Sequence, residues 1–424
     1  MSALLWSRPL PAALQAHTSS SERAVLALLL ASVLYQSLLC MVNTLLFAIN
    51  PTLVALVEAL IYGGVLLLVY RRLPLGLALL ALLALVNLLS LTVLRGLLDA
   101  KSVRDILIIL LFFWLGLRHG SAALVDKVLL LVVGVALLLG LFEWLALEWY
   151  IRVFHTFSYF VNQSGIGRDG GAIFSGQALT LNGFRPDGIG RTILPWLFGP
   201  HRISSIFLEP VSLGNFSVIV LIWALCREGE RRVSLLLAAG AAMLIALSDS
   251  RFGLAMSAML IALRLLLPLR ATALLALAPW AMMAAVYIYS NCFFEGAYSD
   301  SFVGRLTYTG KVLGTLEVGD MLGLQSPLGN YGDMGYAYVL TRFGLPFLLL
   351  GWGLLWLIPL HSAPALRVRA LISLYIAMIL SISGTSLFAL KSAGLLWFLV
   401  GSLCAEGGAR QEALSHAGVQ RHDH

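Results

Sequence analysis

The most regular feature of this chain is its long apolar stretches, which are separated by short polar segments. A helix that crosses a membrane needs about 20 predominantly apolar residues, and stretches of this length recur along the whole chain. They lack strand-type alternation of apolar and polar residues, which favours helices over a barrel. The sequence therefore predicts an all-α fold, a polytopic membrane helical bundle of about 12 transmembrane helices, near 24–46, 52–70, 73–94, 105–120, 125–148, 206–226, 233–249, 252–268, 271–290, 335–359, 367–386 and 388–405.

The composition points the same way. Of 424 residues, 60% are hydrophobic and only 12% are charged, which excludes a soluble domain. Residues 1–23 are polar and have no apolar core before a cleavage site, so we interpret them as a cytoplasmic tail and not as a signal peptide. Residues 406–424 form a second polar tail.

Basic residues in short loops indicate the orientation. They all fall on one side of the predicted membrane: Arg71, Arg72, 227–232, Arg264, Arg270, Arg367 and Arg369. Such a bias marks the cytoplasmic side, and an even number of helices places both termini there. The chain then divides into three groups of helices (24–148, 206–290 and 335–405) and two long loops on the opposite side (149–205 and 291–334).

The opposite side carries more arginine than the bias predicts. Long loops are partly exempt from the rule, but Arg251 and Arg342 lie at the ends of predicted helices. Arginines held there suggest an anionic ligand on the outer face; the alternative is that some contact lipid head groups or loop carboxylates. The set is Arg152, Arg168, Arg185, Arg191, Arg202, Arg251, Arg305 and Arg342.

The sequence predicts no metal, nucleotide cofactor or disulfide framework. The eight histidines are scattered, with no His-x-x-x-His pair on a helix. The segment GIGRDG at 165–170 matches a dinucleotide-binding pattern, but no strand precedes it and no helix follows. Of four cysteines only Cys292 faces outward, so no pair is available there.

The stretch RISSIFLEPVSLGNF places an arginine, a glutamate and a proline at the start of an apolar helix. Ser204 or Ser205 can cap the helix, and Arg202 and Glu209 are two turns apart, near one face. Pro210 bends the helix and frees a carbonyl. Ionisable residues within a span indicate a functional site; the alternative is a structural Arg–Glu pair at a kink.

Two further stretches combine charge with turns on the outer side. SDSRFGL places Arg251 in a tight turn beside Asp249, which could simply neutralise it. The stretch from 304 to 344 begins with Arg305 and leads, through a Gly/Pro turn, into a helix with Asp333 and Tyr336 at its start.

Taken in order, these motifs resemble the O-antigen polymerase/ligase superfamily of bacterial glycosyltransferases. The resemblance covers about residues 200–345 and the twelve-helix layout. It implies a metal-independent enzyme of the bacterial inner membrane, with its site facing the periplasm and without a cofactor. The implied substrate is an oligosaccharide on undecaprenyl diphosphate, and Arg202, Arg251 and Arg305 are expected to bind the diphosphate. Membrane lipids and other polysaccharide-assembly proteins are the implied partners, with no nucleic acid.

One departure separates two activities within this superfamily. Its ligases, which transfer glycan to lipid A-core, usually carry a His-Asn pair where this chain has Gly332-Asp333. Glu-Pro after the first arginine resembles the exopolysaccharide and O-antigen polymerases instead. We therefore expect a polysaccharide polymerase, with an O-antigen ligase as the alternative.

Glycosyl transfer needs a general base for the attacking hydroxyl and cations for the departing diphosphate. Glu209 and Asp333 are the candidate bases and His201 is a third. Arg191, His201 and Tyr336 complete the expected substrate-binding set.

A transporter or flippase of an anionic lipid would use the same arginines but needs buried charge in several helices. Glu58 and Glu143 are the main acids within helices outside the site. A non-catalytic scaffold in polysaccharide assembly is a third possibility.

Overall fold

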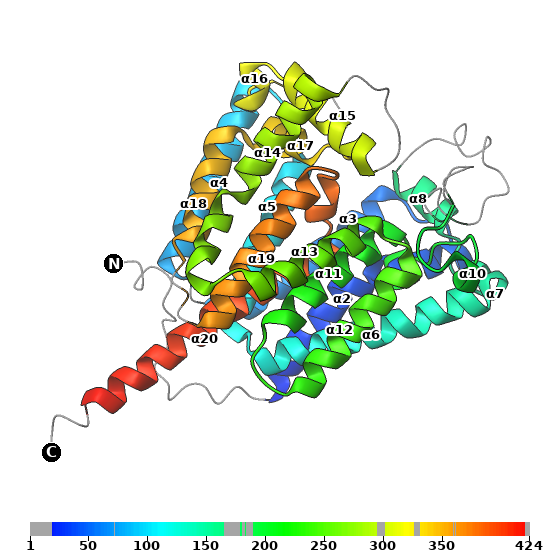
Figure 1. Ribbon diagram of the computed structural model, residues 1–424, viewed down its shortest axis with the longest axis horizontal. Helices are drawn as coiled ribbons and strands as arrows, with labels where there is room; N and C mark the ends of the chain where they lie inside the picture. Colours follow the sequence, from blue (N-terminus) through cyan, green and yellow to red (C-terminus); the bar gives the residue numbers. More distant parts are fainter. Residues whose placement is uncertain are drawn as a thin grey trace.

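The protein is an all-helical membrane protein in the part of the chain that the structure describes (Figure 1). A computed structural model describes residues 19–71, 73–164, 179, 183, 190–294, 302–325, 331–358, 360 and 362–419, and these contain no strand. Within these described ranges, seven helices are long and apolar enough to cross a membrane, or eight if the bent pair α17–α18 is one span. The predicted helical membrane bundle is confirmed to this extent. The GIGRDG segment and most of the N-terminal tail lie outside the described residues.

Long helices make up most of the described chain. They are α2 (Ser19–Leu45), α3 (Pro51–Val69), α4 (Leu75–Arg95), α5 (Ala100–His119), α6 (Ala122–Leu145), α11 (Pro210–Cys226), α12 (Arg231–Ser248), α13 (Arg251–Leu266), α14 (Ala278–Ile288), α15 (Phe302–Thr315), α18 (Leu345–Trp356), α19 (Ala363–Leu380) and α20 (Leu390–Val419). Shorter helical elements join them: α7 (Leu147–Val153), α8 (Thr156–Ser164), α10 (Pro195–Phe198), η3 (Ser205–Phe207), η4 (Leu269–Leu277), η5 (Tyr289–Phe293), α16 (Val318–Met321), α17 (Gly335–Phe343) and η6 (Thr385–Leu387).

The predicted single helix at 335–359 is broken in the structure. Helices α17 and α18 meet at 103° across Gly344, whose φ of 77° is easily reached only by glycine. Arg95, at the end of α4, donates hydrogen bonds to the carbonyls of Thr341 and Arg342. This guanidinium satisfies carbonyls that the end of α17 would otherwise leave without partners, so the break is supported from outside the helix.

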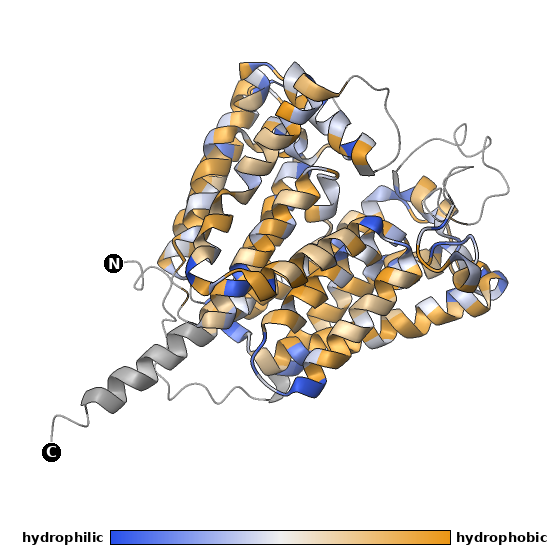
Figure 2. Cartoon of the chain, viewed as in Figure 1, coloured by the Kyte–Doolittle hydropathy of each residue, from blue (hydrophilic) through white to orange (hydrophobic). Residues whose placement is uncertain are grey.

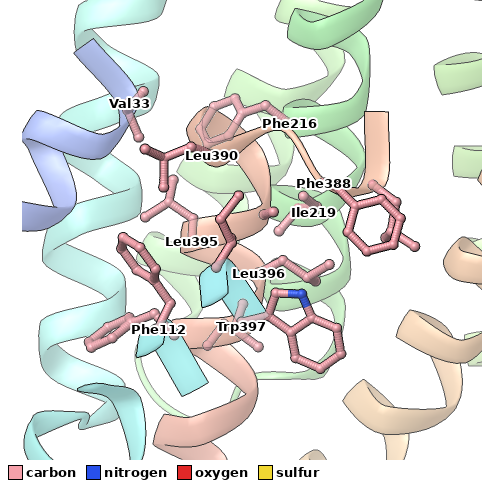
Figure 3. Packing of buried hydrophobic residues seen from close by; sticks show 14 of the residues in the cluster. Val33, Phe112, Phe216, Ile219, Phe388, Leu390, Leu395, Leu396 and Trp397 are labelled. Atoms are coloured by element: carbon pink, nitrogen blue, oxygen red, sulfur yellow. The ribbon is translucent and has the colours of Figure 1, made fainter. Parts of the chain in front are cut away.

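The first part of α20, residues 390–405, is largely buried in the bundle, and α20 packs most extensively against α5. Phe112 of α5, Val33 of α2 and Phe216 of α11 surround Leu395 and Leu396 of α20 (Figure 3). Glycines allow the two central helices to approach closely, as small residues do in membrane bundles. A Cβ atom on Gly116 would lie 2.1 Å from the carbonyl oxygen of Phe398.

The outer helices present leucine to their surroundings, as lipid-facing helices do. Apolar residues cover most helices, whereas polar residues gather toward their ends and in the connecting segments (Figure 2). Exposed leucines on α3 and α4 include Leu56, Leu60, Leu67, Leu79, Leu82 and Leu85. This apolar surface agrees with helices that contact lipid.

Candidate functional site

The turn between α12 and α13 organises one end of the bundle. Asp249 ends α12 in the left-handed conformation, with φ of 48°, and Ser250 caps α13 by accepting a hydrogen bond from Gly253 N at 3.0 Å. The Asp249 carboxylate accepts hydrogen bonds from the backbone N–H groups of Thr192 and Ile193, at 2.9 and 2.7 Å. The aspartate therefore ties the segment before α10 to this turn.

Two of the arginines expected at the site meet at this same turn. Arg202 Nε donates to the carbonyl of Ser248 at 3.2 Å, and Arg202 is only 8% exposed. Arg251 begins α13, and its Nε donates to Thr192 Oγ1 at 2.7 Å. The structure thus brings Arg202 and Arg251, 49 positions apart in the sequence, to one turn of the fold.

Arg191 joins them but makes a different set of contacts. Its guanidinium donates to the carbonyls of Ile193 and Leu247 at 3.0 and 2.8 Å, and also to those of His201 and Ala246. Arg191 is 8% exposed. These bonds connect three backbone segments, at 193, 201 and 246–247. Arg191 therefore stabilises the fold, in addition to the substrate-binding role expected of it.

A fully buried carboxylate anchors the segment that carries Arg202. Glu143, near the end of α6, is 0% exposed and accepts hydrogen bonds from Ser204 N at 3.0 Å and Ser205 N at 2.6 Å. His201 Nε2 lies 2.8 Å from Glu143 Oε1. Glu143 was expected to lie outside the site, yet it holds the site's polypeptide in place. His201, the third candidate base, is engaged in that anchor.

Replacing Glu143 with alanine should destabilise the protein strongly. The change leaves the N–H groups of Ser204 and Ser205 and the ring of His201 buried without their acceptor, and each buried donor left unsatisfied costs about 1–3 kcal/mol. Glu148, exposed on α7, provides the control, because Glu148→Ala should change stability by less than about 0.5 kcal/mol. Thermal unfolding of the two variants in detergent makes the comparison; equal unfolding midpoints would show that the anchor is dispensable.

Glu209 lies at the very start of α11, where it occupies the N-cap position. Its Oε2 accepts a hydrogen bond from Ser212 Oγ at 2.8 Å and lies 3.5 Å from Lys391 Nζ. The Glu209 side chain is 33% exposed, whereas that of Lys391 is 3% exposed. Lys391 also donates to the carbonyl of Phe207 at 2.7 Å. The glutamate is therefore an accessible carboxylate held by a buried lysine.

The expected helical geometry of this stretch is wrong in two respects. Pro210 is the first residue of α11 and does not bend it, because a proline at this position loses no helical hydrogen bond. Glu209 and Arg202 do not share a helical face, because only a short 3₁₀ turn, Ser205–Phe207, and the left-handed Leu208 lie between them. The expected Arg202–Glu209 pair is replaced by Lys391–Glu209.

Strained backbone is concentrated in these segments. Among the described residues, the non-glycine residues with positive φ are Leu194, Ser205, Leu208 and Asp249. A side chain in the left-handed region costs about 1–3 kcal/mol and persists where surrounding contacts enforce it, often at functional sites. All four flank the residues that hold Arg202, Arg251 and Glu209.

Arg305 and Asp333 form a separate pair. Arg305 Nη1 lies 3.7 Å from Asp333 Oδ1, and the Asp333 side chain is 67% exposed. Two residues further on, α17 begins, and its Tyr336 is 3% exposed and donates a hydrogen bond to the carbonyl of Ala377 at 2.8 Å. Asp333 is the more solvated of the two candidate bases and is paired with an arginine.

The structure therefore places the expected residues in three groups. Arg191, His201, Arg202 and Arg251 gather at the α12–α13 turn, Glu209 pairs with Lys391, and Arg305 pairs with Asp333. Sequence reasoning missed Lys391. A lone lysine inside the apolar run before 405 was the available signal, since a charge within a span seldom lacks a partner.

Within the described ranges, no group of three or more His, Cys, Asp or Glu residues is arranged to hold a metal ion. No protein-family model matches this chain, and neither a curated protein nor a solved structure is significantly similar to it.

Proposed function

We propose that the protein is a polysaccharide polymerase that transfers oligosaccharide repeat units between undecaprenyl-diphosphate-linked glycans. The twelve-helix layout, with two long loops and the site on the periplasmic face of the bacterial inner membrane, is part of the proposal. One observation carries it: an accessible carboxylate, Glu209, begins the helix that packs against the turn holding Arg202 and Arg251. A Cβ atom on Gly214 of this helix would lie 2.3 Å from Ser250 Oγ of that turn.

The residues suit the chemistry of the transfer. A hydroxyl of the acceptor sugar attacks the anomeric carbon of the donor, forming the new C–O bond as the bond between that carbon and the diphosphate oxygen breaks. Glu209 takes the hydroxyl proton. Arg202 and Arg251 stabilise the negative charge on the departing diphosphate. The planar guanidinium group is well suited to this, because it can donate two parallel hydrogen bonds to phosphate oxygens.

Lys391 has a defined part in this proposal. A buried ammonium 3.5 Å from Glu209 holds the carboxylate in position at the start of α11. Asp333, paired with Arg305, remains the alternative base, and the Arg305 guanidinium is the third expected diphosphate ligand.

Ladder formation tests the proposal. The purified full-length protein, incubated with lipid-linked repeat units, should produce a ladder of glycans on a gel, each step one repeat unit longer. A ligase would transfer glycan to lipid A-core without lengthening it, so adding lipid A-core in a second reaction separates the two activities. Transfer to lipid A-core with no ladder would establish the ligase; neither product, with folded protein, would contradict both.

A further inference from the structure

A second region of the structure combines an apolar crevice with a group of cations. The crevice has a volume of about 190 Å³ and is lined by α4, α5, α14, α17, α18, α19 and α20. From α5 it takes Ile106, Ile109, Leu110 and Phe113, and from α17 it takes Tyr336, Val339 and Leu340. These elements lie together on the side of the bundle that carries α4 and α18 (Figure 1). The lining of the crevice is apolar and comes from several helices, so the crevice can take a short stretch of a hydrocarbon chain.

Three cations, Lys101, Arg104 and Arg342, form a basic cluster beside the crevice. Lys101 and Arg104 precede Ile106 on α5, and Arg342 follows Leu340 on α17. Lys101 Nζ lies 5.0 Å and Arg342 Cζ 4.7 Å from the centre of the Tyr338 ring, distances at which a cation is attracted to an aromatic face.

One ring joins the basic cluster to the crevice. The Tyr338 ring centre lies 5.8 Å from that of Phe388, which lines the crevice. Tyr338 also donates a hydrogen bond to Asp105 at 2.5 Å, which fixes the ring beneath the two cations.

Two of the three cations in the basic cluster pair directly with carboxylates, and the charge of Glu58 also acts on Arg104. Arg104 pairs with Asp105 at 2.7 Å, and Arg342 pairs with Asp99. Burial alone would raise the pKa of Asp99, but hydrogen bonding from Ser102 and the charge of Arg342 lower it below its usual value, so this partner stays ionised. Within the described chain no acceptor takes a hydrogen bond from Lys101 Nζ. Lys101 can therefore bind an anion without breaking a hydrogen bond to the protein.

We propose that the crevice and the basic cluster form a polyprenyl-diphosphate site for the acceptor substrate, separate from Arg202 and Arg251. The isoprene units nearest the diphosphate occupy the crevice, and the diphosphate contacts Lys101 and the donors of Arg104 and Arg342 that make no hydrogen bond to a carboxylate. The assignment to the acceptor rests on the proposed polymerase activity, which requires two lipid carriers at once. We favour a substrate over a bulk phospholipid because the site is connected to the candidate catalytic residues. Arg342 lies on α17, and Asp333, which pairs with Arg305, directly precedes that helix.

The crevice offers a matched pair of glycines on α18. Gly351 lines it, and Gly353 does not. A Cβ atom built on either glycine meets nothing within 4 Å, so a side chain can begin at both positions without a clash. Gly351→Leu should place a side chain in the crevice and reduce its volume, and Gly353→Leu should leave the crevice unchanged.

Native mass spectrometry of the full-length protein with undecaprenyl diphosphate provides the test. Wild type and Gly353→Leu should bind two molecules. Gly351→Leu and Lys101→Gln should bind one tightly, with affinity for the second reduced about 10- to 100-fold, since a hydrogen bond to a charged group contributes about 1.5–3 kcal/mol. Lys127→Gln, which removes an exposed lysine paired with Glu22, should match wild type.

Two competitors identify the ligand. Inorganic diphosphate should bind this site far more weakly than the lipid, and phosphatidylglycerol should not displace the lipid. Displacement by phosphatidylglycerol would make this a phospholipid site and overturn the acceptor assignment. Unchanged binding of two carriers in both Gly351→Leu and Lys101→Gln would overturn the site itself.

Kinetics separate this inference from the proposed function. In ladder formation, Lys101→Gln should raise KM for the acceptor and leave KM for the donor unchanged. If wild type forms no ladder although its second carrier site depends on Lys101 and Gly351, the polymerase proposal fails and the lipid site stands. If the protein forms a ladder but neither Lys101→Gln nor Gly351→Leu changes KM for the acceptor, the polymerase proposal stands and the acceptor site is refuted.

Discussion

Glu209→Gln should lower the single-turnover rate of glycan transfer by about 10² to 10⁴, because a general base contributes that much to a proton-transfer step. Glutamine keeps the size of the side chain and can still accept the hydrogen bond from Ser212, but it cannot take a proton. Donor binding should survive, since the expected diphosphate ligands are arginines. The measurement is single-turnover transfer from saturating lipid-linked donor.

The pair with Lys391 makes a structural role the main alternative for Glu209. Glutamine would leave the buried ammonium without its counter-charge, so thermal unfolding must be measured beside the rate. A variant that melts like wild type but transfers slowly supports the base. If Glu209→Gln transfers glycan at a rate within a few-fold of wild type, Asp333 is the better candidate for the general base. If Glu209 is the base, Asp333→Asn should lower the rate only mildly.

The fold class was predictable because lipid imposes a simple constraint on sequence. Each span needs a long apolar stretch and internally satisfied backbone groups, so spans such as α4 and α6 could be read from composition alone. The break between α17 and α18 could not be read in this way. It depends on Gly344 and on Arg95, which is brought from α4 by tertiary structure.

The site was predictable in its residue types and less so in its pairings. Arginines on the side that should lack them indicated Arg202 and Arg251, and the structure places both at the α12–α13 turn. Periodicity suggested that Arg202 would face Glu209, but that inference assumed a continuous helix through residues that form a 3₁₀ turn. The partner of Glu209 comes from α20, 182 positions away, and no local pattern encodes such a contact.

Strain explains why local reasoning failed at this place. Left-handed conformations at Ser205 and Leu208 are disfavoured by the residues themselves and are enforced by contacts with Glu143 and neighbouring helices. A sequence pattern reports local preference, so it cannot indicate where the rest of the fold overrides it.

Arg251→Gln should lower the rate of transfer by about 10² to 10³, the usual cost of removing one donor from a developing anion. The protein should fold normally, because Arg251 begins α13 and Ser250 still caps that helix. Thr192, which accepts a hydrogen bond from Arg251, remains tied to Asp249 through its backbone N–H.

Arg191→Gln is the matched control, because Arg191 lies at the same turn with the same charge. Its guanidinium donates to four backbone carbonyls, so the substitution should cost stability, about 1–3 kcal/mol for each buried group left unsatisfied. We expect Arg251→Gln to retain the wild-type unfolding midpoint with little activity, and Arg191→Gln to unfold at lower temperature. Near-normal transfer by Arg251→Gln would remove this arginine from the diphosphate site. A loss of activity in both variants that tracks their loss of stability would assign the whole arginine group to structure, because the loss of transfer would then follow from the weakened fold and not from a missing diphosphate ligand.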